Sequence, residues 1–88
     1  MADDDTTPPV VTNCPDAIFI PVAVGTASEV VLWIEPTATD NSGATPTVTQ
    51  SHQPGDSFLV GTTRVAYTFT DMTGNEATCI FFVTIGKL

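Results

Sequence analysis

Apolar and polar side chains alternate most clearly in the last third of the chain. The apolar positions recur with a period of two in two runs: Val65, Tyr67 and Phe69, and then Cys79, Phe81, Val83 and Ile85. A period of two is typical of a strand with one buried face. Gly74 and Asn75 lie in the polar stretch between the runs, and both residue types tolerate the positive φ of a tight turn. The pattern therefore predicts a hairpin of two long strands.

Shorter strands are predicted upstream of this hairpin. They cover residues 10–14, 17–24, 28–35, 44–51 and 57–60, and turn-forming residues separate them. Pro21 places residues 17–24 on a sheet edge, because proline has no N–H to donate to a ladder. Residues 37–43 are predicted to form a loop after Pro36. No stretch keeps helical spacing, so about seven strands predict an all-β fold, a small antiparallel sandwich.

Five consecutive apolar residues in the predicted strand at 28–35 leave open which side chains face the core. Either Val31 and Trp33 point inward, or Val30, Leu32 and Ile34 do. A buried Trp33 would anchor one sheet on the other, whereas a solvent-exposed Trp33 or Tyr67 could stack on a sugar ring. Carbohydrate binding therefore requires one of these two rings to be exposed.

The chain is acidic, with a formal net charge of −8 in 88 residues, and Arg64 and Lys87 are its permanent cations. It lacks the basic footprint that nucleic acid or anionic lipid headgroups require, so neither is expected as a partner. No apolar run reaches the roughly 18 to 20 residues that span a membrane. We expect one domain at residues 10–86, after an acidic, Thr/Pro-rich linker at residues 1–9 and before a tail at residues 87–88.

Cys14 and Cys79 are the two cysteines, and they lie near the two ends of the predicted domain. A disulfide between them would close a loop of about 65 residues and contribute about 4 kcal/mol on the chain-entropy model. The alternative is a pair of reduced, buried thiols, and a zinc site lacks the further ligands it would need. The disulfide favours an extracellular or cell-surface setting. No signal segment opens the chain, so we expect a piece of a longer protein whose export signal lies elsewhere.

Several spaced motifs closely resemble one known family. They are DTTPPVV, the Cys-Pro pair at residues 14 and 15, Trp33 followed by EPTATDNSG, then GDSFLVGTT, YTFTDMTGNEATC and FFVTI. Together they resemble the HYR domain, or hyalin repeat, over about residues 5–85. The resemblance implies an immunoglobulin-like extracellular module without catalytic activity, often found in tandem arrays or beside adhesion domains. It also implies that Cys14 pairs with Cys79 and that Trp33 is the tryptophan of a sandwich strand.

At four alternate positions this chain departs from the family, whose members carry Ser or Thr there. They are apolar here: Leu32, Ile34, Ile80 and Phe82. If Trp33 and Phe81 face the core, all four face outward. They are then either scattered surface apolar residues, which are ordinary, or a contact surface for a neighbouring repeat or another protein.

Catalysis is not expected, because the chain offers no acid and base pair in a concave site. His52 is the single histidine and is predicted to lie on the surface of a turn, beside Pro54 and Gly55. The sequence predicts no partner for it.

Calcium is the metal that the acidic turns could bind. In an immunoglobulin-like topology the N-terminal linker, the loop after residues 28–35 and the hairpin turn gather at one pole. The candidate ligands are Asp5, Asp40, Asn41, Asp71 and Asn75. Calcium takes six to eight oxygen ligands with relaxed geometry, but Asp and Asn also sit in turns simply because they cap backbones.

These observations predict an extracellular module of a larger, repetitive protein that acts in cell adhesion or protein–protein interaction. One alternative is a structural spacer stiffened by calcium at its junctions with neighbouring domains. A third function, carbohydrate binding, depends on the exposure of Trp33 or Tyr67.

Overall fold

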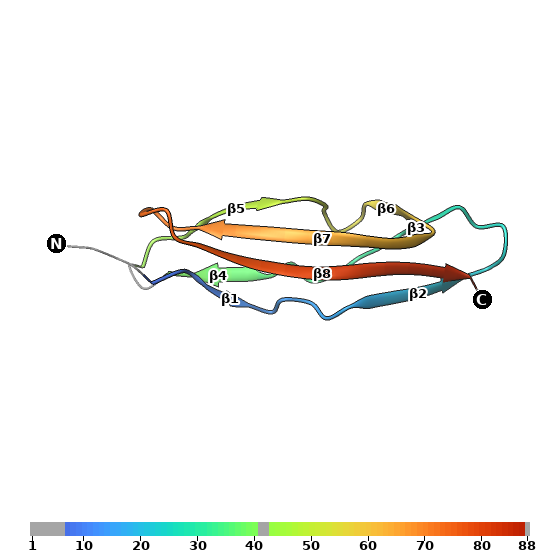
Figure 1. Ribbon diagram of the computed structural model, residues 1–88, viewed down its shortest axis with the longest axis horizontal. Helices are drawn as coiled ribbons and strands as arrows, with labels where there is room; N and C mark the ends of the chain where they lie inside the picture. The colour runs from blue at the N-terminus through green and yellow to red at the C-terminus, as the bar shows by residue number, and fades with distance from the viewer. Residues whose placement is uncertain (1–6, 41–42, 88) are drawn as a thin grey trace.

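The structure, a computed structural model, describes residues 7–40 and 43–87. These residues form eight strands and no helix: β1 (Val10–Thr12), β2 (Ile18–Val22), β3 (Ser28–Val30), β4 (Thr37–Thr39), β5 (Thr47–Gln50), β6 (Ser57–Leu59), β7 (Gly61–Thr70) and β8 (Glu76–Lys87). The strands lie in two layers along one long axis (Figure 1). The all-β prediction is confirmed, and the layers form an immunoglobulin-like sandwich with one disulfide.

One layer is a four-stranded sheet in the order β2-β8-β7-β5. The predicted hairpin of β7 and β8 is its centre, with Val65 opposite Phe81 and Tyr67 opposite Cys79. Directly opposed residues point to the same face of a sheet, so the alternating pattern buries one whole face of the hairpin. The residues of that face are each at most 4% exposed: Val65, Tyr67, Phe69, Cys79, Phe81, Val83 and Ile85.

The second layer consists of two antiparallel ribbons, β1 with β4 and β3 with β6. The predicted strand at residues 28–35 ends early, at Val30, because Val31 pairs with a turn instead of a strand. Its N–H donates to the Asp56 carbonyl, and its carbonyl accepts from the Gly55 N–H. The predicted loop at residues 37–43 is wrong in its first part. Threonine-rich extended backbone suits a strand, and Thr37–Thr39 pair with β1.

β2 pairs with β8 in parallel, with Ile18 beside Val83 and Val22 beside Lys87. This pairing departs from the antiparallel sandwich that the sequence predicts. It arises because the chain passes from β1 in one layer to β2 in the other without reversing, and β8 runs the same way (Figure 1). The predicted edge position of residues 17–24 is confirmed, since β2 ends the strand order of its sheet.

The core lies between the two layers, and it resolves the ambiguity at residues 30–34. Val31 is fully buried, and Trp33 is half-buried against the core cluster. Their neighbours Val30, Leu32 and Ile34 are exposed. The first of the two alternatives is therefore correct, and Val31 and Trp33 face inward.

The molecule is a rod of 59 × 16 × 15 Å, with the first and last described residues, Thr7 and Lys87, at opposite poles (Figure 1). β8 reaches Lys87, one residue into the predicted tail, and Pro9 at the end of the predicted linker is buried. Residues 1–6 lie outside the described part, so the boundaries at residues 9 and 86 stay predictions. Within residues 7–40 and 43–87, no helix has the length and apolar character to cross a membrane.

Candidate functional site

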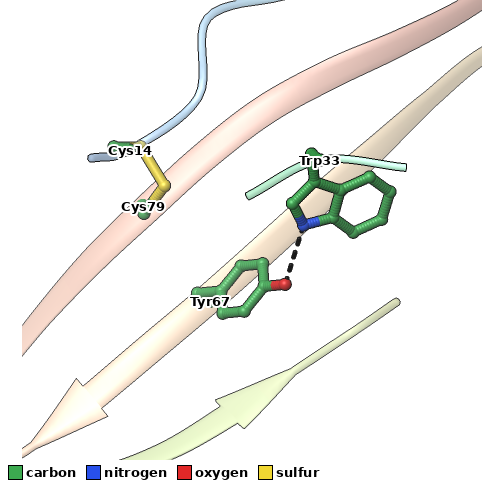
Figure 2. The surroundings of a disulfide bond; sticks show 4 residues. All are labelled: Cys14, Trp33, Tyr67 and Cys79. Carbon is green, nitrogen blue, oxygen red and sulfur yellow. Dashed lines mark hydrogen bonds between the residues drawn. A yellow bond between two sulfur atoms is a disulfide. The ribbon is translucent and has the colours of Figure 1, made fainter. Parts of the chain in front are cut away.

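The disulfide joins the segment between β1 and β2 to the first third of β8. Cys14 and Cys79 are bonded at an S–S distance of 1.99 Å, with their Cα atoms 5.6 Å apart (Figure 2). Cys79 is buried on the core face of β8, whereas Cys14 is exposed. The predicted disulfide is confirmed, and on the chain-entropy model a loop of this length contributes about 4 kcal/mol.

Trp33 and Tyr67 are bound to each other across the sandwich. The indole Nε1 of Trp33 donates to the Tyr67 hydroxyl at 2.9 Å (Figure 2). The indole ring also packs edge-on against Phe81 and Phe58, at centroid distances of 5.3 and 5.9 Å. Such pairs add to the energy of burial. Trp33 is therefore the core anchor that the first alternative describes.

The Tyr67 hydroxyl donates in turn to Glu35 Oε2 at 3.0 Å. Burial raises the pKa of Tyr67 above its ordinary value; the bond from Trp33 opposes this effect and Glu35 adds to it. Tyr67 is 1% exposed. Because Tyr67 is buried and Trp33 is half-buried and hydrogen-bonded, the exposure that carbohydrate binding requires of these rings is not met.

The four predicted contact residues lie on two separate surfaces. Ile80 and Phe82 are 41% and 46% exposed on the outer face of β8, while Leu32 and Ile34 are 74% and 81% exposed in residues 31–36 of the other layer. Trp33 and Phe81, which contact each other, lie between the two pairs. The structure therefore brings Ile80 and Phe82 together and places Leu32 and Ile34 on the opposite side.

Phe19 belongs to the same outer face and was not among the predicted contact residues. The parallel register places it beside Thr84, two residues from Phe82, and its side chain is 63% exposed. Its ring lies over Gly86, where an added Cβ would be 2.8 Å from Phe19 Cε1. Ile18, Phe19 and Ile20 are all apolar, so the sequence does not show that Phe19 points outward, and the register shows which residues it joins. We call Phe19, Ile80 and Phe82 the outer patch.

Asp71 closes the β7–β8 turn. Its Oδ1 accepts from the backbone N–H and hydroxyl of Thr73 and from the N–H of Asn75, and its Oδ2 accepts from Asn75 Nδ2. Burial raises the pKa of Asp71, but these bonds from Asn75 and Thr73 outweigh it and lower the pKa to about 2. The carboxylate is therefore ionised and its oxygens face hydrogen-bond donors.

The predicted calcium ligands fall into two groups. Asp40 follows β4 at the pole where the β7–β8 turn lies (Figure 1), whereas Asp5 and Asn41 are outside the described residues. Asp71 and Asn75 are not arranged as calcium ligands in this structure, because the backbone N–H and Nδ2 of Asn75 donate hydrogen bonds to the Asp71 carboxylate within the turn. Among residues 7–40 and 43–87, no group of three or more His, Cys, Asp or Glu side chains could hold a metal ion. The calcium site stays a prediction.

His52 is less exposed than predicted. Its Nδ1 lies 2.8 Å from Ser51 Oγ, and its ring is 5.2 Å from that of Phe58. A shallow, open pocket of about 380 Å³ lies elsewhere, beside the disulfide, lined by Asn13, Cys14, Pro15, Asp16 and Ile34. Asp16 is the ionisable side chain of that lining, so the pocket does not bring an acid and a base together.

The fold and the disulfide define a small immunoglobulin-like module. The sequence model of the HYR domain matches residues 4–85. The chain belongs to the HYR domain family, whose domain is a non-catalytic module, and no enzymatic family is indicated.

Its relatives include two hyalins and a multidomain protein. The chain is 56% identical over 85 residues to hyalin of Strongylocentrotus purpuratus and 51% identical over 85 residues to hyalin of Lytechinus variegatus. These matches cover 96% and 97% of this chain, but 7% and 16% of the relatives. It is also 41% identical over 81 residues to the mouse sushi, von Willebrand factor type A, EGF and pentraxin domain-containing protein 1. This match covers 92% of this chain and 2% of the mouse protein. The chain thus spans a small part of each relative.

Proposed function

We propose that this domain is an extracellular module of a larger protein and acts in cell adhesion through protein–protein contact. Three observations support the proposal: the family, the much greater length of the relatives and the disulfide, which persists in oxidising compartments. The observation that carries it is the outer patch. Phe19, Ile80 and Phe82 expose large apolar side chains on one sheet face, although the residues that alternate with Ile80 and Phe82 along β8 are already buried in the core.

The surroundings of the outer patch suit a protein partner. Arg64 lies directly opposite Phe82 and Ala66 opposite Ile80, so small and basic residues border the patch. Thr62 and Thr84 lie next along the strands, with their hydroxyls 3.0 Å apart. Aromatic and arginine side chains are enriched at the centres of protein interfaces. A rigid face of this kind needs little ordering when it binds.

The test is the attachment of cells to surfaces coated with the domain. Replacing Ile80 and Phe82 by Thr removes the apolar surface and keeps a residue that favours strands. We expect attachment to fall. The matched control replaces Leu32 and Ile34 by Thr in the other layer, and attachment should persist. Unchanged attachment in the first variant, or loss in the control alone, would contradict the role of the patch.

A structural spacer is the second candidate, favoured by the position of the first and last described residues at opposite poles of a 59 Å rod. Domains joined through such ends would be held apart, and the predicted calcium ion would stiffen the joint. Calorimetric titration with calcium and melting curves in chelator and in millimolar calcium test this part. Asp40→Ala is the variant of choice, because Asp40 is the described candidate ligand that lies outside the turn bonds of Asp71 and Asn75. Asp16→Ala is the control, and a wild-type domain with no heat and no shift in melting would remove calcium from the proposal.

A further inference from the structure

A continuous covalent path of extended backbone runs from one pole of the rod to the other. β1 leads from the N-terminal pole towards Cys14, the disulfide crosses to Cys79 in β8, and β8 continues to the C-terminal pole (Figure 1). The crossing is short, because the two Cα atoms are 5.6 Å apart. β1 and β8 run in the same direction along the rod, so the path does not double back.

We infer that this domain is a tension-bearing link, in which the Cys14–Cys79 disulfide carries the load between the two chain ends. Force applied to the ends passes through residues 1–14, the S–S bond and residues 79–88. Residues 15–78, which supply β2 to β7, lie inside the closed loop and outside the covalent path. The sandwich is therefore attached to the load-bearing chain without being part of it.

The disulfide limits how far the domain can be stretched. Fully extended residues span at most about 3.4 Å each, so the 24 residues of the path reach about 80 Å and the whole chain of 88 about 300 Å. The folded rod is already 59 Å long. Extension with the bond intact is therefore limited to about 20 Å, against about 240 Å when the bond is broken.

The hydrogen bonds between neighbouring strands also resist extension of the domain. If the disulfide is open, tension pulls β2 towards the N-terminal pole and β8 towards the C-terminal pole. The two strands are parallel neighbours from Ile18 beside Val83 to Val22 beside Lys87, so the force shears all their bonds together. β7 flanks β8 on its other side over ten residue pairs. The reduced domain should resist until this clamp fails and then release the whole sandwich.

Single-molecule stretching of the domain between two handles tests the inference. The oxidised domain should release no more than about 20 Å, and the same domain after reduction with dithiothreitol about 240 Å. Release of about 240 Å from the oxidised domain, or equal release in both states, would overturn it. The measurement needs no variant that could fail to fold, and it is independent of adhesion, because a domain that binds no cell can still show the difference.

A pair of insertions supplies the matched control. Ten Gly/Ser residues placed after Met72 lengthen the β7–β8 turn inside the closed loop, whereas the same ten placed after Lys87 lie in the load path. The first insertion should add nothing to the oxidised release and about 34 Å to the reduced one. The second should add about 34 Å to the total length in both states and nothing to the release, because ten unstructured residues outside the fold are already extended under load. If the insertion after Met72 increased the length that the oxidised domain releases, the inferred load path through the disulfide would be wrong.

Discussion

The indole N–H of Trp33 donates a 2.9 Å hydrogen bond to the hydroxyl of Tyr67, which joins residues 31–36 of one layer to β7 of the other. Gln50 Nε2 from β5 approaches the same hydroxyl at 3.3 Å and Glu35 Oε2 at 2.9 Å. Four side chains from three parts of the chain, residues 31–36, β5 and β7, therefore meet in one polar network at the side of the core. The network fixes where the irregular segment crosses the sheet.

Tyr67→Phe should destabilise the domain by about 1–3 kcal/mol, because it leaves the half-buried indole N–H of Trp33 without its acceptor. Urea unfolding measures the change. Thr62→Val is the control, since it removes an exposed hydroxyl bond on the outer face and should cost less than about 0.5 kcal/mol. Equal effects of the two substitutions would mean that the network contributes no more than a surface bond.

Acid should weaken the domain through Asp71. Its pKa in the folded state is about 2, below the ordinary value of 3.8. A lowered carboxyl pKa contributes stability above the unfolded-state pKa, and this contribution is lost as pH falls from about 4 towards 2. Urea midpoints across this window should therefore fall more steeply for the wild type than for Asp71→Asn, which does not titrate. Parallel curves would contradict the assignment.

Gly86→Ala should move the Phe19 ring off the sheet. A Cβ at Gly86 would lie 2.8 Å from Phe19 Cε1, and the ring is free to shift because its side chain is 63% exposed. The cost in stability should stay below about 1 kcal/mol. The measurement is the NMR shift of the new methyl group at residue 86 in Gly86→Ala, which a ring that still covers it would move upfield. Gly86→Ala combined with Phe19→Ala is the reference without a ring, and a methyl shift strongly upfield of that reference would show that the ring has not moved.

Reduction of the disulfide should lower the free energy of unfolding by about 2–5 kcal/mol, because it frees a loop of about 65 residues in the unfolded chain. Urea unfolding with and without reductant measures this loss. Cys14→Ser combined with Cys79→Ser is the control, and reductant should not affect it. A loss below about 1 kcal/mol in the wild type would indicate that the reduced unfolded chain retains its own compact structure.

The sequence predicts the β7–β8 hairpin well because its periodicity and turn are local. Val31 and Trp33 could not be distinguished from their neighbours, since five apolar residues in a row fit either face. The sequence predicts a loop at Thr37–Thr39 because Thr occurs in turns and in strands, and the partner strand β1 decides between the two.

The sequence predicts only part of the outer patch, because the rest depends on pairing between distant segments. Ile80 and Phe82 follow from alternation along β8, but Phe19 joins them through a parallel register between segments far apart in the chain. Asp71 was identified as a turn residue and as a candidate ligand. Four donors around its carboxylate show that it holds the turn, and the sequence does not specify where those donors point.

The pairing of β2 with β8 has a consequence for biosynthesis. A ribosome delivers residues 18–22 long before residues 83–87, so the nascent β2 waits for its hydrogen-bonding partner until synthesis of the domain is almost complete. Cys14 waits for Cys79 in the same way. During that interval β2 has no partner strand. Because Pro21 has no backbone N–H, β2 then offers one hydrogen-bond donor fewer to a strand of another chain. We therefore expect Pro21 to lower the tendency of the nascent chain to aggregate through this strand.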